Sequence, residues 1–502
     1  MLERAAVGRS LLPVILVSLA VKCLLAWRFP WTGDEAYFVL CGKYIAWGYY
    51  DHPPMTAWLL HLLLYLGHSA LFLRLLPILV STAVGVGLYA LLRPYDEHKA
   101  YLVFVLFMIS PINFAFFVVT TDTPIFLFCF LSAVSLFKAE KEHSYLWYML
   151  SGVFLGLAFL SKYFAMLLGL SYLVYFLSVR KDARKTKGFL LLALGTIPFV
   201  AQNAVWNYQT GWPNIMHNWF NRFGHHSSPA INLLCLGPFL IYLMTPGVIY
   251  FLFKNRARVL RDLQKENTRL FVLASLVPLC VFVIVSFKKI VGPHWYVPFL
   301  PFAYVMVAFL LDPQQIAKSI KPALVVSLVQ VSLVFAVSFV PVGKLKGLAK
   351  ETDLASLVMY LYPQRVLQSL EVYGDDFILA TKSYSISALL EYYRGDRVIV
   401  FGKGSHHARQ DDILTNFKEL EGRNILILRR ATADPNEYRP CFDKLEIKPL
   451  KVEEATFSLL FGYGFRYQEY RQRYLLLALR AYYQIPDWLP YSKSFFHEKY
   501  DF

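Results

Sequence analysis

The chain of 502 residues has little charge and few cysteines. Asp, Glu, Lys and Arg make up 17% of it, where an ordinary soluble domain has roughly 25%. The six cysteines show no CxxC pair and no regular spacing, so the sequence predicts neither a zinc knuckle nor a disulfide framework. It contains no GxGxxG fingerprint and no P-loop, and we therefore expect no nucleotide cofactor. This composition excludes a disordered chain and a typical soluble enzyme.

Apolar and aromatic residues are abundant instead. They account for 57% and 17% of the chain, and the mean hydropathy is +0.44. A membrane-spanning helix needs about 20 mainly apolar residues. The sequence contains eleven such segments, near residues 10–28, 69–92, 100–118, 123–138, 145–161, 164–179, 188–205, 231–253, 270–287, 295–311 and 322–341. We therefore predict a polytopic α-helical membrane protein with about eleven spans and a long first outer loop.

The distribution of Lys and Arg orients these segments. If the N-terminus lies inside, the inner loops and the N-terminus together carry nineteen Lys and Arg, and the outer loops carry seven. Cytoplasmic loops of membrane proteins hold such an excess of positive charge. The net charge of +16 is thus mostly an orientation signal, and we expect no basic domain for nucleic acid. An odd number of spans places the C-terminal region outside.

The C-terminal region is richer in charge and has short periodic segments. Apolar runs at residues 377–383, 397–402 and 424–430 predict buried strands, and residues 385–393 and 411–420 predict helices between them. This alternation favours a small α/β domain with a parallel sheet. We expect the aromatic segment 461–490 to lie against the membrane face, where Tyr and Trp concentrate. The chain thus divides into a membrane domain, residues 1–341, and a soluble α/β domain, residues 342–502.

With this topology, the unusual polar residues of the membrane domain all fall on the outer side. Ionisable groups at membrane depth are costly, so they are candidates for function. We expect loops that are distant in sequence to converge at one membrane surface. The candidate site residues are Asp34, Glu35, Asp51, His52, Asp122, Lys162, Tyr163, Trp206, Asn207, Arg222, Lys288, Lys289 and His294.

The carboxylates among them are candidates for catalysis. Asp34 precedes a helix-like run, so it serves either as a general base for an attacking hydroxyl or as a helix N-cap. Glu35 either supports Asp34 or supplies first-turn helix charge. Asp122 lies at a typical helix start, so it serves either as a helix cap or as a group that orients an acceptor or holds a divalent cation. Candidate ligands for such a metal are Asp51, His52 and Asp122, and the sequence leaves the presence of the metal open.

The cations are candidates for binding a lipid phosphate. Two prolines follow Asp51 and His52. His52 can bind a phosphate when protonated or a metal when neutral, and a rigid turn with incidental polar groups is the alternative. Lys162, Lys288 and Lys289 stand on the side that positive-inside bias disfavours. They either bind an anionic phosphate or extend towards the headgroups.

Five motifs together resemble the GT-C superfamily of polyprenyl-phosphate-sugar glycosyltransferases. The motifs are GDEAYF at residues 33–38, WGYYDHPPM at 47–55, TTDTP at 120–124, GLAFLSKYFAML at 156–167 and WNYQTGW at 206–212. The similarity is strongest with the bacterial branch related to protein O-mannosyltransferases and to the lipid A aminoarabinose and galacturonosyl transferases. It covers roughly residues 20–310. The resemblance also implies that Lys288 or Lys289 contacts the donor phosphate.

The resemblance implies an inverting transfer from an undecaprenyl-phosphate-linked sugar to an acceptor, with the active site facing the periplasm of a bacterial inner membrane. It implies that Asp34 is the catalytic base, and that Asp122 helps to bind the acceptor or a metal. Asp51 and His52 fall where the aminoarabinose transferases carry an acidic residue followed by Lys, near the donor phosphate. The His in place of that Lys is a departure from the family pattern.

We therefore expect a hexosyl- or pentosyltransferase whose acceptor is lipid A or the lipopolysaccharide core. A protein Ser/Thr acceptor, as in the protein O-mannosyltransferases, is the second hypothesis. A lipid or glycan transporter or flippase is the alternative from a different class, and it predicts broken helices and polar residues near the middle of the membrane.

Overall fold

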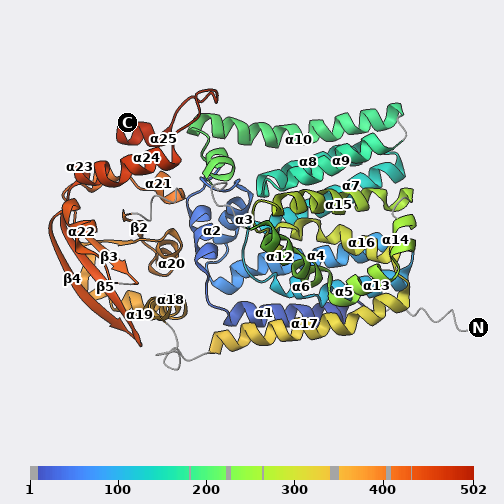
Figure 1. Cartoon of the computed structure of the whole chain (residues 1–502), viewed down its shortest axis with the longest axis horizontal. Coiled ribbons are helices and arrows are strands. Elements are labelled where there is room, and N and C mark those ends of the chain that lie inside the picture. The colour runs from blue at the N-terminus through green and yellow to red at the C-terminus, as the bar shows by residue number, and fades with distance from the viewer. Residues whose placement is uncertain are drawn as a thin grey trace, which may run out of the picture. The chain divides into compact units, whose positions relative to one another are not determined.

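The computed structural model describes residues 10–179, 182–221, 228–262, 265–339, 350–402, 409–430 and 432–502, and Figure 1 shows the chain coloured by residue number. Contacts within the chain divide it into two compact units. The helical unit comprises Met1–Phe29, Gly67–Gln202 and His225–Ala336, and the mixed unit comprises Pro30–Leu66, Asn203–Gly224 and Val337–Phe502. The predicted boundary between residues 341 and 342 lies outside the described residues.

The helical unit is a bundle of apolar helices, and several of them run side by side in Figure 1. An α-helix satisfies its own backbone hydrogen bonds, which lipid cannot do. The helices are α1 (Leu12–Arg28), α4 (Ala70–Leu92), α5 (Glu97–Met108), α6 (Pro111–Ala115), α7 (Asp122–Glu142), α8 (Tyr145–Ser161), α9 (Ala165–Ser178), α10 (Ala183–Thr210), α12 (Pro229–Met244), α13 (Pro246–Lys254), α14 (Arg256–Asp262), α15 (Glu266–Ser286), α16 (Leu300–Leu310) and α17 (Pro313–Phe339).

Each of the eleven predicted segments is mainly helical where it is described, but the count of eleven spans is not confirmed. By length and composition, five described helices can cross a membrane, or up to seven if two bent helix pairs each form one span. Helices α8 and α9 are apolar but have 17 and 14 residues. A helix rises about 1.5 Å per residue, so these are shorter than an average bilayer core. The chain is a multi-pass membrane protein.

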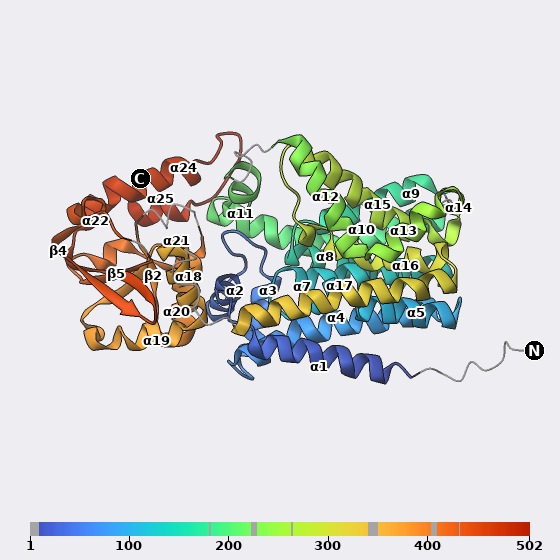
Figure 2. The same ribbon diagram turned by 60° about the horizontal axis from the view of Figure 1, so that its bottom comes forward.

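Close helix packing in this unit depends on small residues. A Cβ atom added to Gly152 of α8 would lie 2.0 Å from the carbonyl oxygen of Leu192 in α10. Only glycine allows the two backbones to approach so closely. Helix α17 packs along α1, where Val331, Val334 and Phe335 contact the cluster around Leu25, and Figure 2 shows the two helices from below.

The mixed unit contains a five-stranded sheet in the order β2-β1-β3-β5-β4. Strands β1 (Ile378–Thr381), β2 (Ile399–Val400) and β3 (Ile425–Arg429) are parallel, and α20 (Tyr384–Arg394) and α21 (Gln410–Leu414) lie between them in the chain. This confirms the three predicted strands, their parallel pairing and the helix at 385–393, whereas the predicted helix 411–420 is α21 followed by a 3-10 turn at Phe417–Leu420. The sequence prediction missed the antiparallel hairpin of β4 (Phe442–Val452) and β5 (Ala455–Phe465).

Both faces of the sheet are covered. Helices α18 (Glu351–Leu361), α19 (Pro363–Gln368) and α20 lie together on one side in Figure 1, with α18 packed on β5 and α20 on β1. On the other face, Ile427 and Leu460 pack among aromatic side chains of α22 (Pro435–Tyr438), α23 (Tyr467–Tyr470), α24 (Leu476–Tyr482) and α25 (Phe495–Tyr500). The aromatic segment 461–490 thus places much of its surface in this core. Burial of these rings explains its composition without the membrane contact that we expected.

Two helices of the predicted first outer loop also belong to the mixed unit. They are α2 (Gly33–Lys43) and α3 (Met55–Leu64), and α2 packs against α20. The first loop and the C-terminal region therefore form one compact body, which carries Asp34 and Asp51.

Candidate functional site

Helix α2 begins with a complete capping box. Thr32 is the N-cap, and its hydroxyl accepts a hydrogen bond from the Glu35 backbone N–H at 3.2 Å. The buried Glu35 carboxylate accepts hydrogen bonds from the Thr32 N–H and hydroxyl, each at 3.1 Å. This reciprocal pattern satisfies backbone donors that a helix start otherwise leaves unpaired. Glu35 therefore stabilises the start of α2, and its support of Asp34 stays a prediction.

Asp34 is not the N-cap. It is exposed in the first turn of α2, where the helix dipole favours negative charge. The hydroxyl of Tyr384, at the start of α20, donates a hydrogen bond to Asp34 Oδ1 at 3.2 Å. The carboxylate is thus held at a defined place and remains accessible, as a general base requires.

Asp51 lies at the centre of a charged cluster. The Tyr37 hydroxyl donates a hydrogen bond to Asp51 Oδ1 at 2.9 Å, and the Arg409 guanidinium lies 3.6 Å from Oδ2. The His52 ring lies 3.5 Å from the same oxygen, and His217 lies 3.3 Å from Arg409 Nη1. The side chain of Asp51 is only 6% exposed. The structure therefore brings the predicted residues Asp51 and His52 together with Arg409 and His217.

Electrostatics in this cluster favour an ionised Asp51. Burial alone would raise the pKa of its carboxyl group, but electrostatic interactions with His52, Arg409 and His217 lower that pKa below its ordinary value. Burial likewise opposes the charge of Arg409, but the interaction with Asp51 raises the pKa of the guanidinium above its ordinary value. Arg409 also lies 4.7 Å from the centre of the Tyr384 ring. Tyr384 therefore connects the cluster to Asp34.

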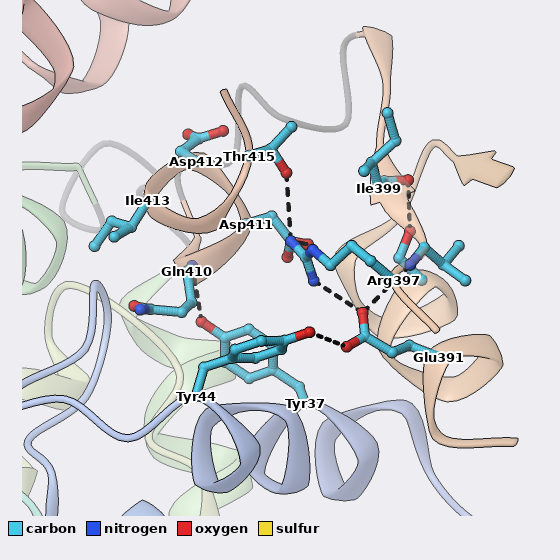
Figure 3. Close-up of polar contacts among 12 residues, drawn as sticks. Tyr37, Tyr44, Glu391, Arg397, Ile399, Gln410, Asp411, Asp412, Ile413 and Thr415 are labelled. Atoms are coloured by element: carbon cyan, nitrogen blue, oxygen red, sulfur yellow. Dashed lines mark hydrogen bonds and ion pairs between the residues drawn. The ribbon is translucent and has the colours of Figure 1, made fainter. Parts of the chain in front are cut away.

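A second network fixes α2 against the sheet region, and Figure 3 shows its members. Arg397 binds Glu391 at 2.9 Å and Asp411 at 3.0 Å, and the Tyr44 hydroxyl donates to Glu391 at 3.1 Å. Although Arg397 is close, burial raises the pKa of the Asp411 carboxyl to about 6. Because Tyr44 directly follows α2, this network helps to position the helix that carries Asp34.

The end of α10 and the segment after it support the Asp51 loop. The Trp206 ring packs on Gly48, where a Cβ atom would lie 2.5 Å from the ring. Buried Asn207 donates a hydrogen bond to the Asn203 carbonyl oxygen at 3.0 Å. Asn214 donates to the Tyr50 carbonyl oxygen at 2.9 Å. Trp206 and Asn214 therefore support the loop that carries Asp51, whereas the hydrogen bond of Asn207 lies within α10 and its role in the site stays a prediction.

The helical unit holds a separate ion pair. Asp122 is the first residue of α7, and its side chain caps no backbone N–H. Its Oδ1 lies 2.7 Å from Lys162 Nζ, and the two side chains are 13% and 16% exposed. A charge-assisted contact of this length is a strong one. Asp122 is thus committed to a lysine and is not a helix cap.

Aromatic rings connect this pair to other predicted cations. Lys162 lies over the Phe164 ring at 5.2 Å, and the Phe164 and Trp295 rings are 5.0 Å apart. Lys289 lies over the Trp295 ring at 5.7 Å, and the exposed His294 directly precedes Trp295 in the sequence. The structure thus brings Lys162 and Lys289 into one neighbourhood.

The other predicted residues are less informative. Lys288 is exposed, and the half-buried Tyr163 packs on Phe159 with ring centres 5.2 Å apart. Arg222 lies outside the described residues.

The predicted metal ligands do not fit a cation well. Asp51 lies 3.6 Å from the Arg409 guanidinium and Asp122 contacts Lys162, so each carboxylate already faces a positive side chain. Within the described residues, no group of three or more His, Cys, Asp or Glu could hold a metal ion. The divalent cation remains a prediction, and no step below depends on it.

Sequence reasoning missed several residues of these clusters. Arg409 and Tyr384 follow β2 and β1, and the carboxyl ends of parallel strands are a common place for ligand contacts. That rule could have identified both.

Lys22 in α1 is also buried, and its Nζ lies 2.9 Å from Ser81 Oγ and 3.4 Å from Asn113 Oδ1. It is a polar group inside an apolar helix.

Comparison with known proteins agrees with this arrangement. The family model described as dolichyl-phosphate-mannose-protein mannosyltransferase matches residues 51–206. The crystal structure of ArnT from Cupriavidus metallidurans in the apo state is similar to this chain with a TM-score of 0.59 at 14% identity, over 90% of this chain and 97% of ArnT. The structure of ArnT bound to undecaprenyl phosphate gives a TM-score of 0.58 at the same identity and coverage. No curated protein sequence matches the chain.

The fold and the matched segment together confirm the resemblance that the five motifs indicated. The chain has the fold of ArnT over nine tenths of its length, and the matched segment begins at Asp51 and includes Asp122 and Lys162. The family-model match and the shared fold thus both agree with the resemblance to the GT-C superfamily of polyprenyl-phosphate-sugar glycosyltransferases.

Proposed function

We propose that this GT-C membrane protein is an inverting glycosyltransferase. It moves a hexosyl or pentosyl group from an undecaprenyl-phosphate-linked donor to a hydroxyl or phosphate of lipid A or the lipopolysaccharide core, at the periplasmic face of a bacterial inner membrane. The observation that carries the proposal is the geometry of Asp34. It is an exposed carboxylate on a capped helix, joined through Tyr384 to the buried cluster of Asp51 and Arg409.

Asp34 acts as the general base in this proposal. Its carboxylate accepts the proton of the acceptor oxygen, which forms a bond to the anomeric carbon from the side opposite the donor phosphate. The bond between that carbon and the phosphate oxygen breaks, and undecaprenyl phosphate leaves with the electron pair. A phosphate is a good leaving group, so no strong general acid is needed.

Positive side chains stabilise the departing phosphate. Lys162 and Lys289 are connected through Phe164 and Trp295, and Lys162 contacts the substrate when it exchanges Asp122 for a phosphate oxygen. The ArnT structure with bound undecaprenyl phosphate supports a polyprenyl-phosphate donor.

Two other functions have specific support. The matching family model is described as a protein mannosyltransferase, which favours a protein hydroxyl as the second candidate acceptor. The buried Lys22 and the two bent helix pairs, with angles of 89° and 102°, are features that a transporter or flippase would have. A translocation assay with a labelled polyprenyl-phosphate sugar in liposomes separates transport from transfer.

The decisive experiment replaces Asp34. The full-length protein is reconstituted in liposomes with an undecaprenyl-phosphate-linked aminoarabinose, galacturonic acid or mannose, and lipid A or a Ser/Thr peptide is supplied as acceptor. We expect Asp34→Asn to lower turnover by about 100-fold or more, because the base supplies a factor of that size. Mass spectrometry of the acceptor identifies the sugar.

Asp487→Asn is the matched control, because Asp487 is an exposed aspartate of the C-terminal segment. We expect it to retain wild-type turnover, and both variants should insert and unfold like the wild type. Near-normal turnover of Asp34→Asn would contradict the assignment of the base. If no donor is consumed with any acceptor, the proposed enzyme class is wrong.

A further inference from the structure

The sheet of the mixed unit has a crevice at the carboxyl ends of its parallel strands. Its volume is about 510 Å³, within the usual range for small-ligand pockets. The segment after β1 lines it, together with the end of β3, α18, and Arg409, which lies between β2 and α21 in the chain. Its lining includes Ser356, Lys382, Ser383, Tyr384, Arg409 and Arg430.

The order of the strands predicts a ligand at this place. The chain leaves β1 towards β2 and leaves its neighbour β3 towards the β4–β5 hairpin, so the connections from these two adjacent strands run in opposite directions along the sheet. In open α/β sheets, ligands bind outside the carboxyl ends of the strands at such a switch point. Helix α20, with 11 residues, also begins here, and its N-cap Ser383 makes no side-chain capping bond. A helix N-terminus attracts negative charge.

The lining of the crevice is basic. Among the described lining residues, Lys382, Arg409, Arg429 and Arg430 contribute four cations, and Asp353 is the one carboxylate. Some of this charge is shared, since Lys382 and Arg429 each lie 3.7 Å from Glu437 behind the lining, and Arg409 contacts Asp51.

Arg430 differs from these three cations. Its Nη1 donates a hydrogen bond to the neutral Ser356 hydroxyl at 3.0 Å. The crevice therefore offers a guanidinium beside hydroxyl groups, a combination that suits a sugar carrying a phosphate.

A second pocket of the same sheet provides an internal contrast. It has a volume of about 460 Å³ and lies at the amino ends of the parallel strands, where Phe377 precedes β1. Its charged lining residues are Glu371, Arg394 and Asp396, so negative charge is in excess. The two pockets are similar in size, and only the one at the carboxyl ends is suited to an anion.

We propose that the crevice at the carboxyl ends of β1 and β3 binds a phosphorylated sugar of the acceptor. This inference rests on the proposed function, because Tyr384 lines the crevice and also donates a hydrogen bond to Asp34. A phosphosugar held by Arg430 and Lys382 brings its neighbouring oxygen atoms towards the base. The crevice therefore selects a phosphorylated glycan over a protein Ser/Thr side chain.

Binding measurements test the crevice without the transfer reaction. The full-length protein in phosphatidylcholine nanodiscs is titrated with N-acetylglucosamine 1-phosphate and, separately, with N-acetylglucosamine. We expect only the phosphosugar to bind. Arg430→Gln and Lys382→Gln should each weaken it by about tenfold, the usual effect of losing one charge-assisted contact. Arg473→Gln is the matched control, since Arg473 is exposed and paired with Glu469 away from the crevice lining.

Several results would overturn the proposal. They are undetectable binding of the phosphosugar, equal binding of the neutral sugar, and equal affinity of the wild type and the Arg430→Gln/Lys382→Gln double variant. Full displacement of the phosphosugar by phosphatidylglycerol in the nanodisc would assign the crevice to a lipid headgroup and would also overturn it.

Asp34→Asn separates this proposal from the proposed function. We expect it to bind the phosphosugar normally while transfer is lost. If the protein binds the phosphosugar through Arg430 but has no transferase activity, the proposed crevice stands and the proposed enzymatic function is refuted. Transfer that depends on Asp34, without any binding of the phosphosugar, would refute the crevice alone. In the transfer assay, Arg430→Gln should raise the KM for a phosphorylated acceptor and leave kcat nearly unchanged.

Discussion

The two units of the chain each enclose a carboxylate against a cation, but in different ways. In the helical unit, Asp122 contacts Lys162 at 2.7 Å. In the mixed unit, Asp51 faces His52, Arg409 and His217 and accepts a hydrogen bond from Tyr37, with its side chain 6% exposed. The desolvation of a buried carboxylate is costly unless several groups compensate it.

This difference indicates different roles for the two regions. Several partners from separate chain segments hold Asp51, so the cluster connects the first loop to the C-terminal segment as a fixed support. Lys162 is a flexible point charge that can exchange one anion for another. We therefore expect a substrate phosphate to bind Lys162 in place of Asp122, and we expect the Asp51 cluster to keep its geometry.

Breaking the Asp51 cluster should have the largest effect on stability. Arg409→Met leaves a buried carboxylate with less compensation, and we expect the free energy of unfolding to fall by about 3 kcal/mol. Asp51→Asn in the same chain should recover part of that loss, since the uncompensated charge is then absent. Thermal unfolding of the detergent-solubilised protein measures both variants. An Arg409→Met protein as stable as the wild type would refute the supporting role.

The sign of the pH dependence follows from the pKa shift. Because the folded protein lowers the pKa of Asp51, its ionised form adds stability above the ordinary carboxyl pKa. That contribution is lost as the pH falls through the lowered value. The destabilisation by Arg409→Met should therefore be larger at pH 7 than at a pH of about 4.

Breaking the ion pair of Lys162 and Asp122 should have a smaller effect, and this effect should be on catalysis. Lys162→Gln should lower kcat/KM for the undecaprenyl-phosphate-linked donor by about tenfold, because one charge-assisted contact to the phosphate is lost. Asp122→Asn should reduce it less. The double variant distinguishes the roles. If Asp122→Asn restores the activity of Lys162→Gln, the lysine only neutralises Asp122 and does not touch the donor.

The sequence predicted much of the fold because the relevant signals are local. The three parallel strands are short apolar runs, and two helices between them were recognisable by their periodicity. Strand β4 was missed because it is an exposed edge strand with alternating charges and Pro449, and such strands lack an apolar run. Strand β5 ends inside an aromatic segment that suggested a membrane surface.

The site was predictable only in part, for a related reason. Asp34, Asp51 and Asp122 stand in compact motifs, which identify them by their immediate neighbours. The contacts of Tyr384 with Asp34 and of Arg409 with Asp51 join residues 350 or more positions apart. Tertiary packing alone creates such pairs, so no spacing in the sequence indicates them.

The smallest expected effect concerns the link between Asp34 and Tyr384. Tyr384→Phe removes the hydroxyl that lies 3.2 Å from Asp34 and keeps the ring that packs against Arg409. We expect turnover to fall by about threefold, because one hydrogen bond to an exposed carboxylate contributes little. Tyr89→Phe is the matched control, since the Tyr89 hydroxyl donates to Glu97 at 3.1 Å in the helical unit. If both variants slow transfer equally, the loss reflects stability. A decrease confined to Tyr384→Phe means that the C-terminal segment orients the base directly.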